Sequence, residues 1–424
     1  MPKLNRFSLK TAWQEMNPNV KLVFGYSFFQ SLGRGIWMGN VLSVWIYLIS
    51  NESNELLGLT SAITGLAMTI TVLPAGYISD KTQHRYMLRL AAIVGFIGLS
   101  FALFASSLEI MFLALLFWGL FQGMNRPSVE SIFADSVESG TRSEIYAQVH
   151  LVRQLGMAIG PLVNVLLFLF FGDDWSLPVL KSVMVIGIVL SMLSLAFMVF
   201  FDDRKSLGSE SDKIVEIMDK IQVVGSTIEN NPNKRYVIIV VLLLSNLIIG
   251  FGAGMTIKFF PIFFRNIYFL EPITVQLIMG GTGILTGIIS IYTQRLSLRN
   301  GRAPMIFTVQ GIATLCLFII ATYPPVFLLV PIFFARGSLM NASQPLSRSI
   351  LMDVVPKKHR GGVNALQALA WGLFWNVSAA IGGFLIGSDD NFRLCFLITG
   401  FIYVLGTLPI LLLIPLVSRE KNHL

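Results

Sequence analysis

The chain has 424 residues, of which 54% are hydrophobic and 13% are charged, and its mean hydropathy is +0.71. A soluble domain of this size cannot bury so many apolar side chains, so the composition predicts an integral membrane protein in a lipid bilayer. In a membrane protein, the location of the positive residues indicates the orientation of the chain. The formal charge of +8 is interpreted in this way, and no nucleic acid is expected as a partner.

A helix needs about 20 apolar residues to cross a bilayer. Twelve such stretches follow one another, at residues 22–49, 57–79, 87–106, 109–133, 144–171, 179–201, 236–264, 272–293, 303–322, 325–352, 362–387 and 392–417. We therefore expect an all-α membrane protein with 12 transmembrane helices. The segment before residue 22 is polar and basic, which is not typical of a signal peptide.

An even number of spans places both termini on one side of the membrane. If that side is cytoplasmic, most of the 31 Lys and Arg residues lie in cytoplasmic segments, and the outer loops contain Lys181, Arg265 and Arg393. This asymmetry follows the positive-inside rule, so both termini are expected in the cytoplasm. The sequence leaves open which membrane holds the protein and whether the sequon at Asn51 is glycosylated.

The longest hydrophilic stretch separates the first six spans from the last six. It predicts an N-terminal six-helix half (1–201), a cytoplasmic linker (202–235) and a C-terminal six-helix half (236–424). Within the linker, the segment 211–224 has apolar residues at helical spacing. Either an amphipathic helix on the membrane surface or a solvated helix would produce this pattern.

The two halves repeat one another, because matching residues recur 217 or 218 positions apart in three helix pairs. The matches are LGRGIWMG at 32–39 with IGFGAGMT at 249–256, TG at 64–65 with TG at 282–283, and Pro127, Asp135 and Arg142 with Pro345, Asp353 and Arg360. One register held over so much of the chain predicts two pseudo-symmetric six-helix bundles.

A charged motif interrupts the apolar sequence between the second and third spans. Residues 76–85, GYISDKTQHR, place Gly76, Asp80, Lys81 and Arg85 at fixed spacing. The motif resembles the signature loop of the major facilitator superfamily, G-x-x-x-D-[RK]-x-G-R-[RK], although the two positions before Arg85 differ. With the twelve spans and the repeat, the resemblance covers nearly the whole chain and implies the fold of a secondary transporter.

The resemblance also implies a gate at the cytoplasmic side. In the family, the acid at position 80 faces the amino-terminal end of helix 11, where the helix dipole favours negative charge. Lys81 and Arg85 are expected to pair with acids such as Asp135, or else only to fix the topology. The predicted gating residues are Gly76, Asp80, Lys81, Arg85, Asp135 and Arg142.

Two family motifs are incomplete here. Gly119 occupies the fourth-helix position at which many proton-linked members have an arginine, so that motif does not imply proton antiport. The fifth span contains GMAIGP at 156–161, as drug antiporters do, but Ala147 and Asn164 replace two other glycines of that motif. Close helix packing through small residues is the favoured interpretation.

Charged residues inside the spans point to the substrate, because each costs at least about 2.5–3.5 kcal/mol to insert. They are Arg34, Arg126, Glu130, Arg153, Lys258, Arg336 and Arg348. Three arginines, at positions 34, 126 and 336, fall near the middle of the bilayer, whereas Lys258 and Arg348 lie nearer the ends, where a structural role is favoured. Glu130 is one turn from Arg126 and is placed to pair with it, and Glu130 and Arg153 are candidates for proton coupling.

In the superfamily, helices 1, 4, 7 and 10 line a central cavity that holds the substrate. Guanidinium groups bind carboxylate or phosphate through paired hydrogen bonds, so three arginines there predict an anion. The predicted substrate-binding residues are Arg34, Arg126, Arg336, Trp37, Gln122, Asn125, Asn341 and Gln344, with Gln30 and Trp371 nearby.

The predicted function is a secondary active transporter that moves a small organic or phosphorylated anion by alternating access, with protons or a counter-anion as candidate coupled species. A proton-linked drug or metabolite exporter, a uniporter and a transport-fold receptor remain alternatives. The histidines are scattered and both cysteines lie in apolar runs, so no enzymatic activity, metal or cofactor is expected. We expect a monomer.

Overall fold

The computed structural model describes residues 16–137, 142–207, 232–355 and 357–417. These residues form α-helices and short 3-10 helices, without strands. The first half contains α2 (Pro18–Trp37), α3 (Asn40–Ile49), α4 (Asn54–Lys81), α5 (His84–Phe104), α6 (Leu108–Asp135), α7 (Arg142–Phe171), α8 (Leu177–Val199) and η1 (Asp203–Lys205). The second half contains α10 (Pro232–Thr256), η3 (Ile257–Phe259), α11 (Phe260–Tyr268), α12 (Pro272–Asn300), α13 (Arg302–Ile320), α14 (Val326–Val354), α15 (Lys357–Ile386), α16 (Phe392–Thr407) and η4 (Leu408–Leu413).

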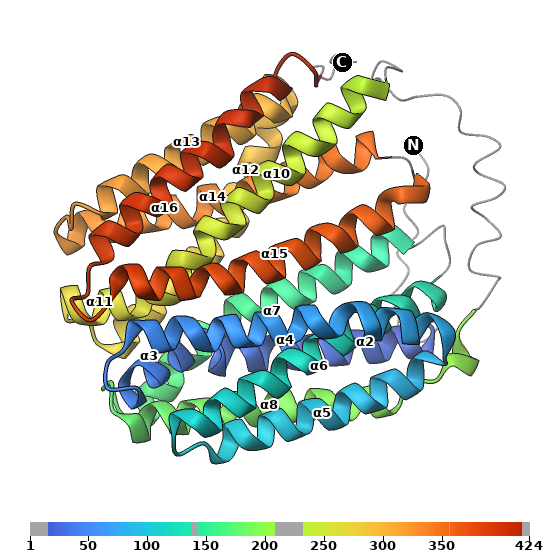
Figure 1. Ribbon diagram of the computed structural model, residues 1–424, viewed down its shortest axis with the longest axis horizontal. Coiled ribbons are helices and arrows are strands. Elements are labelled where there is room, and N and C mark those ends of the chain that lie inside the picture. Colours follow the sequence, from blue (N-terminus) through green and yellow to red (C-terminus); the bar gives the residue numbers. More distant parts are fainter. Residues whose placement is uncertain (1–15, 138–141, 208–231, 356, 418–424) are drawn as a thin grey trace, which may run out of the picture.

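The helices form two bundles, one from each half of the chain (Figure 1). The bundles meet where α4 packs on α15 and where α7 packs on α12. In the part of the chain that the structure describes, ten helical segments are long and apolar enough to cross a membrane, and the bent pair α2–α3 makes an eleventh. One more long helix is α15. The side chains in its first half are not among those that the structure describes. The expected all-helical, two-bundle membrane fold is confirmed.

The sequence repeat reappears in the helix boundaries. The helices α4, α5 and α6 begin at 54, 84 and 108, and α12, α13 and α14 begin at 272, 302 and 326, so each pair of starts is 218 residues apart. The first helix of each half is also broken inside the repeated motif: α2 and α3 meet at an angle of 41°, and α10 gives way to η3 after Thr256. The repeat therefore fixes where the first helix of each half breaks.

Local sequence explains where several helices begin. The side chain of Asn17 accepts a hydrogen bond from the backbone N–H of Asn19 (2.8 Å), and Pro18 occupies the first turn, where a missing N–H costs nothing. Ser53 caps α4 in the same way by accepting from Leu56 N–H (3.2 Å). These caps satisfy backbone donors that the helix itself leaves unpaired.

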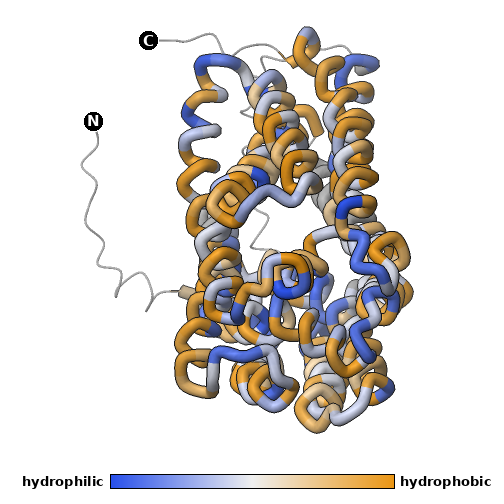
Figure 2. The backbone as a smooth tube through the Cα atoms, turned by 90° about the vertical axis from the view of Figure 1, so that its left-hand side faces the viewer, coloured by the Kyte–Doolittle hydropathy of each residue, from blue (hydrophilic) through white to orange (hydrophobic). Residues whose placement is uncertain are grey.

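Small residues allow neighbouring helices to approach closely. A methyl group added to Gly160 of α7 would overlap the backbone of Gly35 in α2, and one added to Gly156 would lie 2.7 Å from Cβ of Ser31. The glycines of the fifth-span motif therefore act in packing, as expected. Hydrophobic residues predominate along the helices of both bundles (Figure 2), and many large ones are exposed, as contact with lipid requires.

The molecule has two ends that differ in how the halves meet. We call the end where α8 finishes and α10 starts the linker end, and the opposite end, with the loops 50–53 and 387–391, the far end. Hydrogen bonds between the halves gather toward the far end, for example from Asn54 Nδ2 to Gly387 O (2.9 Å) and from Trp175 Nε1 to Leu270 O (2.8 Å). The halves are thus joined at the far end.

Candidate functional site

Three cations from three helical elements, α2, α6 and η3, are electrostatically linked where the two halves face one another. Arg34 lies in the last turn of α2, and Lys258 lies in η3, so each is beside the break in the first helix of its half. Arg34 is electrostatically coupled to both Arg126 of α6 and Lys258. The Lys258 ammonium also donates a hydrogen bond to the hydroxyl of Ser61 on α4, across the interface. We call Arg34, Arg126 and Lys258 the cationic cluster.

Within the part of the chain that the structure describes, the cationic cluster has no carboxylate as an ion-pair partner. The ion pairs found there involve other side chains. Arg34 Nε is buried without a hydrogen-bond partner. Arg34 and Lys258 are half-buried, so their like charges are only partly screened by solvent and repel one another. The cluster is therefore suited to hold an anion.

Glu130 pairs with an arginine of another helix. Its carboxylate lies 3.0 Å from Nη1 of Arg153 on α7, and Nε of Arg153 donates to Ser27 Oγ on α2 (3.2 Å). The expected pairing of Glu130 with Arg126 is therefore wrong. Spacing along α6 placed the two residues on one face, but α7 packs close enough for Arg153 to take the carboxylate. Arg126 is exposed, and no described residue accepts a hydrogen bond from it.

A buried polar pair lies among the arginines. Asn125 Nδ2 donates a hydrogen bond to the hydroxyl of Tyr26 (2.5 Å), and Oδ1 of Asn125 is buried without a partner. Tyr26 is electrostatically coupled to Arg34, Arg126 and Arg153. Asn125 was expected from the sequence, whereas Tyr26 was missed because a tyrosine in an apolar span carries no signal of its own.

The structure does not bring Arg336 to Arg34 and Arg126. Arg336 is 5% exposed, its Nη2 donates to the hydroxyl of Tyr403 on α16 (2.9 Å), and its guanidinium lies over the ring of Phe260 at 5.0 Å. It is thus enclosed within the second half. Depth in the membrane was inferred from position along α14, but the rotation of that helix turns Arg336 toward its own bundle.

The other expected contact residues differ in exposure. Trp37 is buried in the first half, where Nε1 donates to Ser191 Oγ (3.1 Å) and the ring packs edge-on against Trp118. Gln122 is 9% exposed. Asn341 is exposed and donates to the backbone oxygen of Gly337 (2.9 Å). Gln344 is half-buried, and the side chain of Trp371 lies outside the described residues.

Comparison with known proteins identifies the family. The model of the Major Facilitator Superfamily matches residues 23–243 and again 242–423, which together span almost the whole chain. The two matches follow the two bundles of the structure. The chain belongs to the major facilitator superfamily. It is therefore a membrane transporter and not an enzyme.

Two curated members of the superfamily match part of this transporter. One is a Na(+), Li(+), K(+)/H(+) antiporter of Planococcus maritimus, 27% identical over 153 residues, or 35% of each chain. The other is the uncharacterized MFS-type transporter YqjV of Bacillus subtilis (strain 168), 27% identical over 159 residues, or 37% of each chain. The matched segment thus spans little more than a third of these relatives.

Solved structures share the fold of this transporter. The nucleoside transporter NupG superimposes with a TM-score of 0.67 at 13% identity, covering 93% of this chain and 98% of that chain. A bacterial homolog of the human lysosomal transporter Spinster, inward-facing and unoccupied, gives a TM-score of 0.71 at 12% identity, with coverage of 93% and 95%. At such identities the likeness establishes the fold alone.

The signature loop of this transporter makes ion pairs that the sequence did not predict. Arg85 Nη1 lies 3.4 Å from Asp202 Oδ1, and His84 Nδ1 lies 3.0 Å from Asp203 Oδ1. Lys81 contacts the hydroxyl and the ring of Tyr77, one turn earlier on α4. The expected pairing of Lys81 and Arg85 with Asp135 is therefore not found. Two acids directly after α8 are closer, and their position in the linker gave no hint of this contact.

The remaining gating predictions are only partly described. Gly76 lies in α4, and a methyl group there would meet Pro127 only at 4.0 Å, so no close approach requires glycine. Asp135 ends α6, and its backbone oxygen accepts from Leu207 N–H (2.8 Å). The side chains of Asp80 and Arg142 lie outside the described residues, as does the linker segment 211–224. Their proposed roles stay predictions.

The carboxylate of Asp203 fastens the signature loop to the end of the first half. Burial opposes its ionisation, but hydrogen bonds from Arg85 N–H (3.0 Å), His84 N–H (2.9 Å) and the His84 ring outweigh burial and lower the pKa of Asp203 below its usual value. A lowered folded-state pKa stabilises the fold above the unfolded value of about 3.9, and this contribution is lost as the pH falls through the folded value.

Replacing Asp203 with Asn is therefore expected to lower the melting temperature at neutral pH and to have a smaller effect as the pH falls below about 4, where the parent loses the same charge. Melting curves of parent and Asp203→Asn in detergent from pH 7 to pH 3 measure this. Asp174→Asn, on a loop at the far end, is the control for loss of a loop acid. A difference in melting temperature that stays constant with pH would contradict the role of the Asp203 charge.

At the far end, hydrogen bonds connect the halves around Asp390. Its Oδ1 accepts from Asn54 Nδ2 (2.9 Å) of the first half, and its Oδ2 accepts from Asn266 Nδ2 (2.7 Å). Asn266 Nδ2 also contacts the hydroxyl of Tyr47 (2.7 Å), and Arg265 pairs with Glu52 (3.2 Å). Sequence reasoning missed this network because its members lie in loops and near helix ends that are far apart in the chain.

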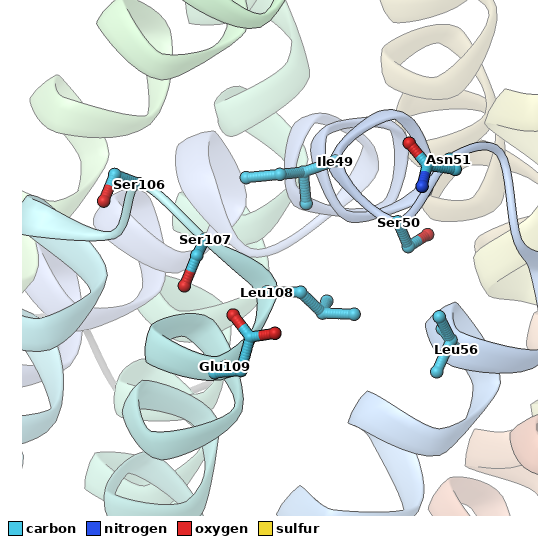
Figure 3. A pocket seen from close by; sticks show the side chains of 8 residues that line it. All are labelled: Ile49, Ser50, Asn51, Leu56, Ser106, Ser107, Leu108 and Glu109. Carbon is cyan, nitrogen blue, oxygen red and sulfur yellow. The ribbon is translucent and has the colours of Figure 1, made fainter.

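A separate pocket of about 400 Å³ opens at the far end of the first half (Figure 3). It lies between the end of α3, the start of α4 and the turn before α6, and its lining residues are Ile49, Ser50, Asn51, Leu56, Ser106, Ser107, Leu108 and Glu109. Glu109 is the one charged residue in this lining. The pocket is thus unrelated to the cationic cluster.

Proposed function

We propose that this transporter moves a small organic or phosphorylated anion by alternating access. The supporting observation is the cationic cluster: Arg34 interacts electrostatically with both Arg126 and Lys258, and no described carboxylate forms an ion pair with any of the three. In transporters of this architecture, substrate sites lie at the interface of the repeats. An anion bound there would offset a repulsion that the protein leaves in place.

We also propose how the transporter is oriented in the membrane. With both termini in the cytoplasm, the far end faces outward, and the hydrogen bonds around Asp390 close the outer side. The molecule would then be open toward the cytoplasm, like the inward-facing structures of a bacterial ferroportin homologue and of the bacterial Spinster homolog. We further propose the halves 1–201 and 236–424 as the moving units, and a monomer as the functional form.

Anion binding is tested by thermal shift on purified protein with sodium salts of succinate, phosphate, sulfate and glycerol 3-phosphate. A ligand that binds the folded state at 100 times its Kd stabilises it by about 2.7 kcal/mol. We expect one or more of these anions to raise the melting temperature at constant ionic strength. Stabilisation by sodium, lithium or potassium ions in the absence of any effect of the anions would instead favour cation exchange, as named for the Planococcus maritimus relative.

If transport is proton-linked, Glu130 is the proposed proton site. It is exposed and lies in α6, and protonation would release Arg153, its partner at 3.0 Å. Glu130→Gln is therefore expected to abolish uptake driven by a pH gradient in proteoliposomes, measured with the anion that stabilises the parent most. Glu109→Gln, at the other end of the same helix, is the matched control and should retain uptake. Uptake that survives Glu130→Gln would exclude Glu130 as the coupling residue.

A further inference from the structure

The second half lacks its expected cation at the site, because Arg336 is enclosed against Tyr403 and Phe260. In a transporter whose two halves move around a bound substrate, residues of both halves contact that substrate. In the described part of the second half, the cation coupled to Arg34 is Lys258, which was expected from the sequence to have a structural role near a helix end. The break at η3 changes that expectation, since it turns this residue toward α4 of the first half.

The contact of Lys258 crosses the interface between the halves. Its ammonium donates to the hydroxyl of Ser61, which is 1% exposed, and this neutral partner leaves the charge uncompensated. An ammonium has three donors, so a ligand can bind while the bond to Ser61 is kept or replaced. On the other side, Arg34 Nε is buried and has no partner. Donors of both halves thus lie within electrostatic reach of one another.

The charge balance of the site favours a ligand with more than one negative charge. Glu130 acts electrostatically on Arg126, but its carboxylate is paired with Arg153 at 3.0 Å. Arg34, Arg126 and Lys258 then leave three positive charges, and a singly charged anion would offset only one of them. Arg126 is exposed and free to meet a second acidic group of the same ligand.

We propose that the transported anion is a dianion, one acidic group of which is bound jointly by Arg34 of the first half and Lys258 of the second. This inference rests on the proposed anion transport. The class includes dicarboxylates and phosphate monoesters, which carry two charges near neutral pH. Because the ligand bridges the halves through these two residues, its binding favours their approach.

The test compares dianions with a monoanion. Succinate, sulfate and glycerol 3-phosphate are titrated against acetate at constant ionic strength, and dissociation constants are taken from melting temperatures. In the parent, the tightest dianion should bind at least tenfold more strongly than acetate. Lys258→Met should weaken that dianion by about ten- to a hundredfold, as expected for loss of a hydrogen bond to a charged group, and reduce its preference over acetate. Lys258→Arg, which keeps the charge, should retain most of the preference.

Arg348→Gln provides the matched control, since it removes one positive charge from an exposed position of α14. It should change dianion affinity less than threefold. Equal weakening in Arg348→Gln and Lys258→Met, or parental affinity in Lys258→Met, would overturn the role of Lys258. Equal binding of acetate and the dianions by the parent would overturn the dianion class. If the parent binds none of these anions, the proposed anion transport itself fails, which is a different result from loss confined to the Lys258 variants.

Discussion

Replacing Asp390 with Asn is expected to shift the resting population of the transporter away from the form that is closed at the far end. The carboxylate accepts from Asn54 Nδ2 (2.9 Å) and Asn266 Nδ2 (2.7 Å), and an amide at this position would turn an NH2 group toward one of these donors. Losing one hydrogen bond to a charged group costs about 1.5–3 kcal/mol. The ratio of the two forms should therefore change by about ten- to a hundredfold.

Accessibility of single cysteines to a membrane-impermeant maleimide measures this population. The background lacks Cys316 and Cys395, the two free cysteines, and one cysteine is placed at each end of the facing surfaces. In Asp390→Asn, labelling should rise at the far end and fall at the linker end. Asp389→Asn is the control, because the described hydrogen bond of Asp389 is with its neighbour Ser388. Identical labelling of Asp390→Asn and the parent would rule out a closing role for Asp390.

Replacing Arg34 or Arg126 with Lys is expected to weaken anion binding by about ten- to a hundredfold, although the charge is kept. A guanidinium offers two parallel donors to a carboxylate or phosphate, and an ammonium offers a single point charge. Losing one such contact costs about 1.5–3 kcal/mol. Arg34 Nε is already buried without a partner, so its substitution should have the larger effect.

Affinity for the anion that stabilises the parent most is measured in both variants and in Arg336→Lys, with Arg348→Lys as the control for an exposed arginine of the second half. Melting temperatures without ligand establish that the variants fold. Parental affinity in both Arg34→Lys and Arg126→Lys would refute the anion site. A loss confined to Arg336→Lys would favour the sequence-based expectation over the arrangement in the structure, in which Arg336 contacts Tyr403.

The sequence predicted the architecture because its signals are local or periodic. Apolar stretches of about 20 residues identify the helices that are long enough to cross a bilayer. The 218-residue register between the halves appears again in the starts of α4 and α12. The signature motif at 76–85 indicated the superfamily, which the family model confirms. These features follow from the chain alone, since helix formation and membrane insertion depend on runs of neighbouring residues.

Only the tertiary structure decided which charged side chains meet. Position along a span gives depth, at about 1.5 Å per residue, but not the rotation of the helix or the identity of its neighbour. For this reason Glu130 was assigned to Arg126, whereas the packing of α7 brings Arg153 to it, and Arg336 was expected beside Arg34 but faces Tyr403. Lys258 was expected near a helix end, in a structural role. A break in that helix instead places Lys258 against Ser61 in the other half of the protein.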